Sequence, residues 1–329
     1  MTLPRRKALR LVLGAATLPA ITPMAWAQAY PTRPISMIVP YSAGGPADTV
    51  GRVLAERMKA ALGQPVVIEN VSGANGSTAV GRVARAVADG YTLSLGVWNT
   101  HVSNGALYAL PYDVLNDFEP VALLASFSSM IVARKALPAN DLKELVAWLK
   151  ANPGKASQGS AGVGSMGHLA GVYFQNISGT RLQHVPYRGS APAMQDLVAG
   201  QIDMMIDAPV IILPQLRAGT IKAFAVLAKS RLVQAPDIPT ADEAGLPGFH
   251  VSNWFGLWAP RGTAKDIVGR LNAAAVSSLA DPAARQKLAD LGFEIPPREQ
   301  QTPEALAVFQ KAEIEKWWPI IKAADIKGD

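Results

Sequence analysis

The sequence has no cysteine among its 329 residues. This absence excludes disulfide bonds, thiolate catalysis and a lipid-modified N-terminal cysteine. No basic run follows residue 10, so we do not expect a nucleic-acid partner. No apolar stretch beyond the N-terminal segment reaches the length of about 20 residues that spans a bilayer, so we expect no stable membrane insertion. The 49% of hydrophobic residues instead indicates a globular chain, whose length suggests two domains.

Residues 1–27 have the pattern of a secretory signal peptide. Basic residues are concentrated at 5–10, a short apolar stretch follows at 11–21, and Ala25-Trp26-Ala27 is an A-x-A cleavage site, so the mature chain is predicted to begin at Gln28. The twin-arginine and general export routes both remain open. An uncleaved N-terminal anchor is the alternative.

Removal of this segment changes the charge of the protein. The formal net charge of +6 comes from 31 basic and 25 acidic residues, and the segment carries four of the basic ones. The mature chain therefore has 27 basic against 25 acidic residues, which is +2. An exported chain without a lipid anchor needs another barrier to retain it, which predicts a periplasmic location.

Strand-like and helix-like segments alternate along the mature chain, which predicts an α/β fold with mainly parallel sheets flanked by helices. Asp48 is the predicted N-cap of the first helix and Gly63 its predicted end. The predicted elements of the first part are strands at 34–41, 65–70 and 91–98 and helices at 48–62 and 77–88.

The same alternation returns further along the chain. Asp141 and Glu144 form a capping-box pair before one helix, and Thr302 precedes Pro303 at the start of another. Two amphipathic helices, the first from Ala264, are predicted to complete the chain. The other predicted elements are helices at 141–151, 191–199 and 209–218, strands at 183–187, 202–207 and 221–228, and a strand, loop and helix over 156–178.

Two long strand-like segments predict crossings between two lobes. They are 118–134 and HVSNWFGLWA at 250–259. The predicted first lobe comprises 28–128 plus 253–329, and the second comprises 129–252. A domain inserted in this way is joined by two strands, which is a hinge arrangement.

Two glycine-rich loops, 40–48 and 159–168, each lie between a predicted strand and a predicted helix. Free backbone N–H groups and the helix dipole at such a position favour an anion. The loops include Tyr41 and the hydroxyl groups of Ser42, Ser160 and Ser165. One loop in each lobe predicts a shared site in the cleft; two tight turns without a ligand are the alternative.

Further candidates adjoin these loops. Trp98 and Asn99 follow the third predicted strand, and His168 lies at a helix start, where a structural hydrogen bond is its simpler role. Asp207 lies at the carboxyl end of a predicted strand and faces the cleft in this interpretation, whereas Asp203 is the more structural of the two.

Enzyme signatures are scarce. The pattern Gly162-x-Gly164-x-x-Gly167 matches a dinucleotide fingerprint, but the acidic residue expected about 20 positions later is missing. There is no G-x-S-x-G, Ser-x-x-Lys or H-E-x-x-H pattern. We therefore expect no cofactor, no metal site and no catalytic residue.

Six ordered blocks resemble the Bug-type receptors of tripartite tricarboxylate transport systems, over about residues 30 to 325. The blocks are YSAGGPADTVGRVLAERM, GQPVVIENVSGANG, DGYTLSLG, LPYDVLNDFEPVALL, GSAGVGSMGHL and VPYRGSAPAMQDLVAGQIDMM.

This resemblance implies a two-lobed type II periplasmic-binding-protein fold that closes on a small organic acid. It also implies delivery to membrane transporter subunits, a role without catalysis, and Asp207 near the distal end of the ligand. The loop residues that it implies as carboxylate contacts are Ser42, Ala43, Gly44, Gly45, Ser160, Ala161, Gly162, Gly164 and Ser165.

Two alternatives share this fold. One is a sensory module that signals to a membrane partner, and the other is a periplasmic enzyme that uses a loop serine with His168. We expect a monomer, because a trap that opens and closes needs free lobes.

Overall fold

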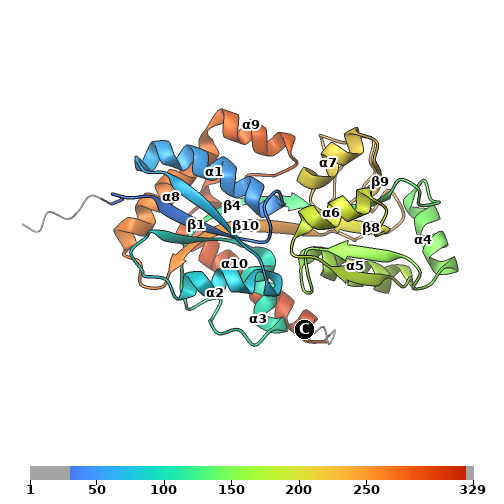
Figure 1. The fold of residues 1–329 in the computed structure, drawn as a ribbon, viewed down its shortest axis with the longest axis horizontal. Helices are drawn as coiled ribbons and strands as arrows, with labels where there is room; N and C mark the ends of the chain where they lie inside the picture. The colour runs from blue at the N-terminus through green and yellow to red at the C-terminus, as the bar shows by residue number, and fades with distance from the viewer. Residues whose placement is uncertain (1–29, 324–329) are drawn as a thin grey trace, which may run out of the picture. The chain divides into compact units, whose positions relative to one another are not determined.

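The computed structural model describes residues 30–323, in which two five-stranded sheets are each flanked by helices (Figure 1). The first sheet has the order β2-β1-β3-β10-β4. β1 is parallel to β2 and β3, whereas β10 is antiparallel to β3 and β4. Its strands are β1 (Ile35–Pro40), β2 (Val66–Val71), β3 (Thr92–Val97), β4 (Phe118–Ser128) and β10 (Ser252–Pro260).

The second sheet has the same design, in the order β7-β6-β8-β5-β9. β6 is parallel to β7 and β8, and β5 is antiparallel to β8 and β9. The one reversed strand of each sheet is the strand by which the chain enters it from the other lobe. The predicted α/β fold with mainly parallel sheets is confirmed. The strands are β5 (Met130–Arg134), β6 (Ser157–Ser160), β7 (Gln183–Pro186), β8 (Met204–Asp207) and β9 (Ile221–Val226).

The two crossings between the sheets lie side by side. Ser129 alone separates β4 from β5, so the long run expected at 118–134 is divided between two sheets. The Ser129 amide donates to the Val251 carbonyl at 2.9 Å, and the Leu227 amide donates to the Ser129 carbonyl at 2.8 Å. Backbone hydrogen bonds therefore join the outgoing strand to the returning segment just before β10.

Helices cover both faces of the first sheet, with α1, α8 and α9 on one face and α2, α3 and α10 on the other (Figure 1). The helices of the first lobe are α1 (Pro46–Leu62), α2 (Ser77–Ala84), α3 (Asn104–Leu107), α8 (Lys265–Ala280), α9 (Pro282–Asp290) and α10 (Pro303–Ala323). Those of the second are α4 (Leu142–Ala151), α5 (Met166–Ser178), α6 (Ser190–Val198) and α7 (Pro209–Arg217).

Several predicted helix ends are confirmed. Gly63 ends α1 in the left-handed conformation, at φ 71°, and donates its N–H to the Lys59 carbonyl. The Asp141 side chain accepts from the Glu144 amide at the start of α4, and Thr302 Oγ1 accepts from the Ala305 amide. These ends follow local rules that a sequence displays directly.

The prediction that Asp48 caps α1 is wrong. Gly45 is the N-cap and Pro46 the first helical residue, which suits the fixed φ of proline. Asp48 is the third residue of α1, and its Oδ2 accepts a hydrogen bond from the Gly44 amide at 2.9 Å. Its carboxylate therefore restrains the loop before the helix.

Two other helix predictions also need correction. The helix expected over 77–88 ends at Ala84, and α9 makes three C-terminal helices where two were expected. Asp281 explains the third helix, because its extended backbone ends α8 and its side chain accepts from the Ala284 amide to begin α9. Pro282 favours this break, since a residue before proline avoids the helical region.

One histidine without a predicted role proves to be part of the core. His101 is fully buried and its ring stacks on Trp258, with ring centroids 3.8 Å apart. Burial lowers the pKa of His101 to about 3. It is therefore a neutral packing residue at physiological pH.

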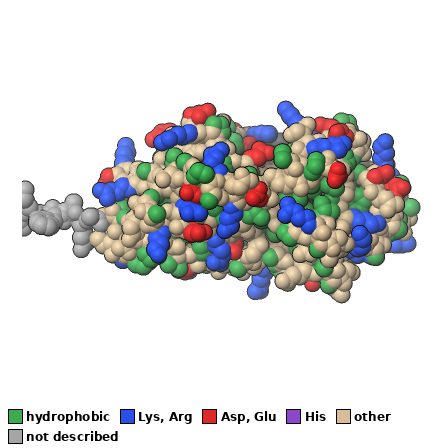
Figure 2. Space-filling view, turned by 90° about the horizontal axis from the view of Figure 1, so that it is seen from above, with side chains coloured by type: hydrophobic (Ala, Val, Ile, Leu, Met, Phe, Trp, Pro, Cys, Tyr) green, Lys and Arg blue, Asp and Glu red, His purple; other side chains and the backbone are tan. Residues whose placement is uncertain are grey.

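Lysine and arginine are interspersed with aspartate and glutamate on the face shown in Figure 2. Across residues 30–323, no helix combines the length and apolar character needed to cross a membrane. The predicted signal segment 1–27 lies outside the described residues.

Candidate functional site

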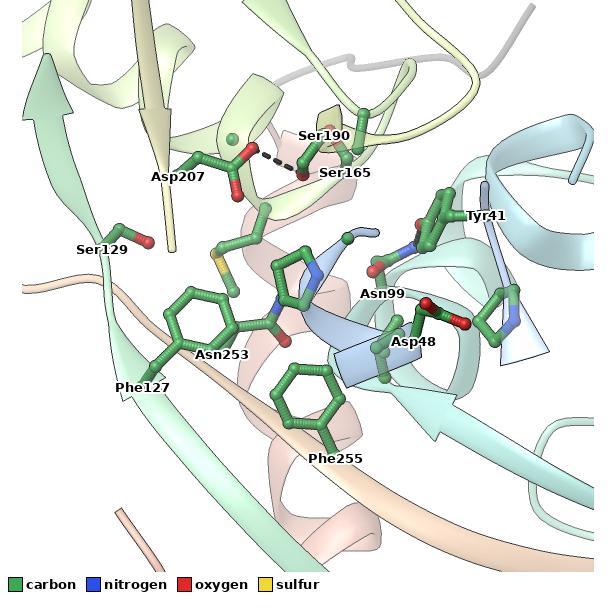
Figure 3. Close-up of a pocket in the computed structure, with 18 of the residues that line it drawn as sticks. Tyr41, Asp48, Asn99, Phe127, Ser129, Ser165, Ser190, Asp207, Asn253 and Phe255 are labelled. Atoms are coloured by element: carbon green, nitrogen blue, oxygen red, sulfur yellow. Dashed lines mark hydrogen bonds between the residues drawn. The ribbon is translucent and has the colours of Figure 1, made fainter. Parts of the chain in front are cut away.

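A pocket lies between the two sheets, where the ends of β1, β3, β6 and β8 meet the crossing strands (Figure 3). Both lobes contribute to it, as expected for strands whose carboxyl ends face a common cleft. The lining residues are Pro40, Tyr41, Ser42, Gly45, Pro46, Ala47, Asp48, Val97, Asn99, Phe127, Ser129, Ala161, Ser165, Met166, Gly167, Ser190, Ile206, Asp207, Asn253 and Phe255.

The first loop is held in an unusual backbone conformation. Tyr41 has a φ of 74°, which non-glycine residues rarely adopt. Its hydroxyl donates to Asn75 Oδ1 at 2.8 Å and accepts from Asn99 Nδ2. Burial raises the pKa of Tyr41 far above its usual value, so the group is a neutral phenol. Backbone strain of this kind persists only where surrounding contacts over-determine it, and it often accompanies function.

The first loop also contains a hydroxyl oxygen without a protein partner. Ser42 Oγ is buried and makes no hydrogen bond with the described part of the chain. The Ser42 amide, in contrast, donates to the Arg188 carbonyl of the other lobe at 3.2 Å. Because a buried polar group without a partner is costly, a ligand or water molecule that bonded to Ser42 Oγ would remove that cost.

The charge of Asp48 is stabilised from outside the pocket. Burial disfavours its ionised form, but hydrogen bonds from Arg52, Gly44 and Asn70 outweigh burial and hold the pKa of Asp48 below its usual value. Arg52 Nε lies 2.8 Å from Asp48 Oδ2, and the arginine side chain is 57% exposed. Arg52 therefore balances the charge of Asp48 without lining the pocket.

The second loop is organised by side chains that bond to its own backbone. Ser160 Oγ accepts from the Gly162 amide at 3.2 Å, and His168 Nδ1 accepts from the Gly164 amide at 3.0 Å. Ser165 caps α5 by accepting from the His168 amide. Several N–H groups expected to be free are thus engaged within the loop.

A histidine pair supports this loop from behind. His168 and His184 stack with ring centroids 3.9 Å apart, and His184 Nε2 lies 2.7 Å from Ser160 Oγ. Burial, and secondarily the neighbouring His168, lower the pKa of His184 to about 4. Neither histidine lines the pocket, so this pair positions the loop.

The two lobes contact each other directly through this loop. Tyr108 Oη of the first lobe donates to the Val163 carbonyl at 2.7 Å, and Ser103 Oγ donates to the Gly164 carbonyl at 3.3 Å. With the Ser42–Arg188 bond, these contacts hold the lobes together around the pocket. Tyr108 and Ser103 were not among the predicted residues, because nothing in their local sequence identifies a partner more than 50 positions away.

Asp207 faces the pocket from the second lobe (Figure 3). Its Oδ2 accepts from Ser190 Oγ at 2.7 Å and its Oδ1 from the Ala208 amide at 2.8 Å. Burial raises the pKa of Asp207 to about 6, against the effect of these two hydrogen bonds. Its charge thus has neutral donors and no ion pair among the described residues.

Asp203 directly precedes β8, at the opposite end of the strand from Asp207, and its contacts stabilise the second sheet. It forms an ion pair with Arg134 at 2.7 Å and accepts from both the amide and the hydroxyl of Ser157. These bonds connect three strand ends of the second sheet, and Asp203 does not line the pocket.

The structure brings half of the predicted site residues to the pocket wall. Those that line it are Tyr41, Ser42, Gly45, Asn99, Ala161, Ser165 and Asp207. Those that do not are Ala43, Gly44, Trp98, Ser160, Gly162, Gly164 and His168. Most of the second group shape the two loops, whereas Trp98 is buried and donates from Nε1 to Glu313 at 2.9 Å.

The crossing strands supply four lining residues that were not among the predicted site residues. Phe127 and Ser129 come from the outgoing crossing, and Asn253 and Phe255 come from β10 (Figure 3). Both crossings were recognised as segments, and the alternation of their residues was the available signal. Which face of each strand meets the pocket, however, depends on pairing across the two sheets. Within residues 30–323, no group of three or more potential metal ligands is present.

Comparisons with known proteins find a matching family and similar solved structures. The sequence model of the family described as "Tripartite tricarboxylate transporter family receptor" matches residues 50–326. The chain is 41% identical to malate-bound MatC from Rhodopseudomonas palustris, over 89% of this chain and 100% of that one, with a TM-score of 0.85.

Two further solved structures are similar. The periplasmic binding protein BugD is 39% identical, over 91% of this chain and 99% of that one, with a TM-score of 0.87. An R. palustris protein solved with adipate is 34% identical over the same shares, with a TM-score of 0.86.

Proposed function

Because the chain belongs to the family of tripartite tricarboxylate transporter receptors, we propose that it captures a small carboxylate in the pocket between its lobes and releases it to a membrane transporter. Membership confirms the Bug-type resemblance and the two-lobed type II fold. It also confirms the prediction of a periplasmic solute-binding protein rather than an enzyme.

One observation carries the proposed site. The pocket is lined by the first turns of two helices, one from each lobe: Pro46, Ala47 and Asp48 of α1, and Met166 and Gly167 of α5. First-turn N–H groups, which Pro46 lacks, have no carbonyl partner four residues earlier, and the helix dipole favours an anion beside them. A carboxylate bound between these helix ends would contact both lobes at once.

Loop side chains add hydrogen-bond donors at the same place. Ser42 Oγ is buried without a protein partner and lies on the lining of the pocket. Charge-assisted hydrogen bonds are worth about 1.5–3 kcal/mol each, so a few of them suffice for useful affinity. The ligands of the relatives, malate and adipate, are carboxylates that such donors suit.

Ligand capture is a hinge motion in this proposal. The lobes, 28–128 with 253–329 and 129–252, turn about the paired crossings, and a carboxylate that touches both favours the closed state. The contacts of Tyr108 and Ser42 with the opposite lobe belong to that closed state. The protein acts as a monomer.

Export completes the proposed role. Residues 1–27 are removed, and the mature protein from Gln28 serves its membrane transporter subunits in the periplasm. Mass spectrometry of protein recovered from the periplasm tests this step: the expected N-terminus is Gln28, and an intact Met1–Ala27 segment would contradict it.

A thermal-shift screen tests the ligand assignment. The mature protein is heated with a panel of mono-, di- and tricarboxylates, and each acid has its neutral amide as the control. Ligands that bind only the native state raise Tm by mass action. We expect a rise of several degrees with one carboxylate class and none with the amides. An unchanged Tm with every acid would refute the carboxylate assignment.

A further inference from the structure

All the non-glycine residues with a positive φ in the described part of the chain belong to one cluster. They are Tyr41 in the first glycine-rich loop, and Ala74 and Asn75 in the turn before α2, with φ values of 74°, 43° and 48°. The Tyr41 hydroxyl donates to Asn75 Oδ1 at 2.8 Å. Because such backbone strain persists only where surrounding contacts hold it, the loop and the turn restrain each other.

Asn75 does not line the pocket, but it bonds to two residues that do, Tyr41 and Asn99. Asn99 Nδ2 donates to Asn75 Oδ1 at 3.2 Å and to the Asn75 carbonyl at 3.3 Å. The same NH₂ group donates to the Tyr41 hydroxyl. These bonds use the NH₂ group of Asn99, and its amide oxygen points away from Tyr41 (Figure 3). Asn75 therefore fixes the orientation of two side chains on the pocket wall.

A second asparagine holds Asn75 from behind. Asn75 Nδ2 donates to Asn104 Oδ1 at 2.9 Å. Asn104 Nδ2 in turn donates to the Asn75 carbonyl at 3.0 Å and to Ser77 Oγ at 2.9 Å. Both asparagines are buried, so this two-way pairing selects one orientation of the Asn75 amide. A buried network whose members are bonded in this way is rigid and specifies one arrangement.

The Asn75 side chain also lies against the glycine-rich loop of the second lobe. A Cβ atom at Gly164 would lie 3.1 Å from Asn75 Nδ2, and one at Gly162 would lie 3.7 Å from Asn75 Oδ1. Ser103 Oγ, in the first lobe, lies 3.3 Å from the carbonyl oxygens of both Asn99 and Gly164. The cluster therefore contacts both loops that flank the pocket, one from each lobe.

From these contacts we infer that Asn75 is a positioning residue for ligand capture. It holds Tyr41 and Asn99 in the arrangement of the closed pocket, and it packs against the second loop when the lobes are closed. Without its side-chain amide, the first loop relaxes from its strained form, and the ligand must restore that form on binding. The inference rests on the proposed function, since it needs a ligand between the lobes. It goes beyond that function by making affinity depend on a residue that does not line the pocket.

Isothermal titration of the mature Asn75→Gly variant tests the inference, with malate, adipate, citrate, glutamate and benzoate as probes. Glycine adopts a φ of 48° readily, so the substitution removes the amide and keeps the backbone conformation. The Kd of each acid that binds the wild type should rise by about fivefold or more. Asn116→Gly is the matched control, because Asn116 is exposed in the first lobe and its side chain donates to Asp113 at 3.0 Å. Its Kd should equal that of the wild type.

Hydrogen exchange of the ligand-free proteins separates positioning from a general loss of stability. In Asn75→Gly, the exchange rate of the amides in residues 41–45 should increase by a factor about fivefold larger than that of the amides in β9, which lies in the second sheet. A residue that only stabilised the fold would change both segments by the same factor. Equal factors for the two segments overturn the inference.

Tyr41→Phe provides the second test if Asn75→Gly fails to fold. It removes the hydroxyl that bonds to Asn75 and Asn99 and keeps the ring, so it should raise the Kd by about twofold or more and speed exchange in residues 41–45. An unchanged Kd in a folded Asn75→Gly or Tyr41→Phe protein overturns the inference while the proposed function stands. Failure of the wild type to bind any of the five acids overturns both.

Discussion

Removal of the Tyr108 hydroxyl should weaken ligand binding, because it destabilises the closed state and leaves the open state unchanged. Tyr108 lies in the first lobe and donates from Oη to the Val163 carbonyl of the second lobe at 2.7 Å. In an open receptor both groups would bond to water, so this hydrogen bond contributes only to closure. Tyr108→Phe removes it and preserves the ring.

The expected size of the effect follows from the net worth of one such bond. A hydrogen bond between neutral groups contributes about 0.5–1.5 kcal/mol net. If the free receptor is mainly open, the apparent Kd rises by the same free energy, which is a factor of about 2 to 13. Because the lobes close after the ligand has entered, the higher Kd should come mainly from a faster dissociation rate.

Titration calorimetry gives the Kd, and stopped-flow displacement gives the dissociation rate. Tyr91→Phe is the matched control, because the Tyr91 hydroxyl accepts from the Thr32 amide at 2.9 Å within the first lobe. The control should leave affinity unchanged, whatever it does to Tm. Equal Kd values for Tyr108→Phe and the wild type would refute the idea that this contact stabilises the closed receptor.

Three other predictions concern the loop, the second sheet and pH. Gly162→Val should reduce affinity by more than about tenfold with the fold retained by circular dichroism, because Gly162 has a φ of 132° that a β-branched residue cannot adopt without strain; unchanged affinity would show that the loop conformation does not matter. Asp203→Ala should lower the free energy of unfolding by about 2–3 kcal/mol and leave the Kd alone, because it leaves Arg134 without its partner; chemical denaturation measures the first and calorimetry the second. The folded pKa of His184 is about 4 against 6.5 for an ordinary histidine, so its neutral form stabilises the fold fully above pH 6.5 and this contribution is lost as the pH falls toward 4. Asp207, whose pKa is raised to about 6, has the opposite effect, because its contribution to stability increases as the pH falls. The effect of His184 is therefore measured by comparing the His184→Gln variant with the wild type. The Tm of the variant should fall less than that of the wild type between pH 7 and 5, and equal decreases would contradict the assignment.

The sequence alone determined the fold class and the approximate position of the site. Strands and helices follow from hydrophobic periodicity, and helix ends such as Gly63 and Asp141 follow from local backbone preferences, all of which act over a few neighbouring residues. The two glycine-rich loops were visible for the same reason, because a strand, a tight turn and a helix start are contiguous in the chain.

Some local sequence patterns are compatible with more than one helix boundary, and the wrong boundary was predicted for two of them. Asp48 is a good N-cap by type, but Pro46 starts the helix earlier and places that carboxylate on the Gly44 amide. The break between α8 and α9 likewise depends on one residue, Asp281, that ends one helix and begins the next.

Tertiary structure decided which residues face the ligand. Phe127, Ser129, Asn253 and Phe255 reach the pocket because two crossing strands, more than 100 residues apart in the chain, lie next to each other at the hinge. The Tyr108–Val163 bond likewise joins groups from different lobes. Such contacts depend on strand order and lobe closure, which are set by the packing of the whole chain, and no window of neighbouring residues contains that information.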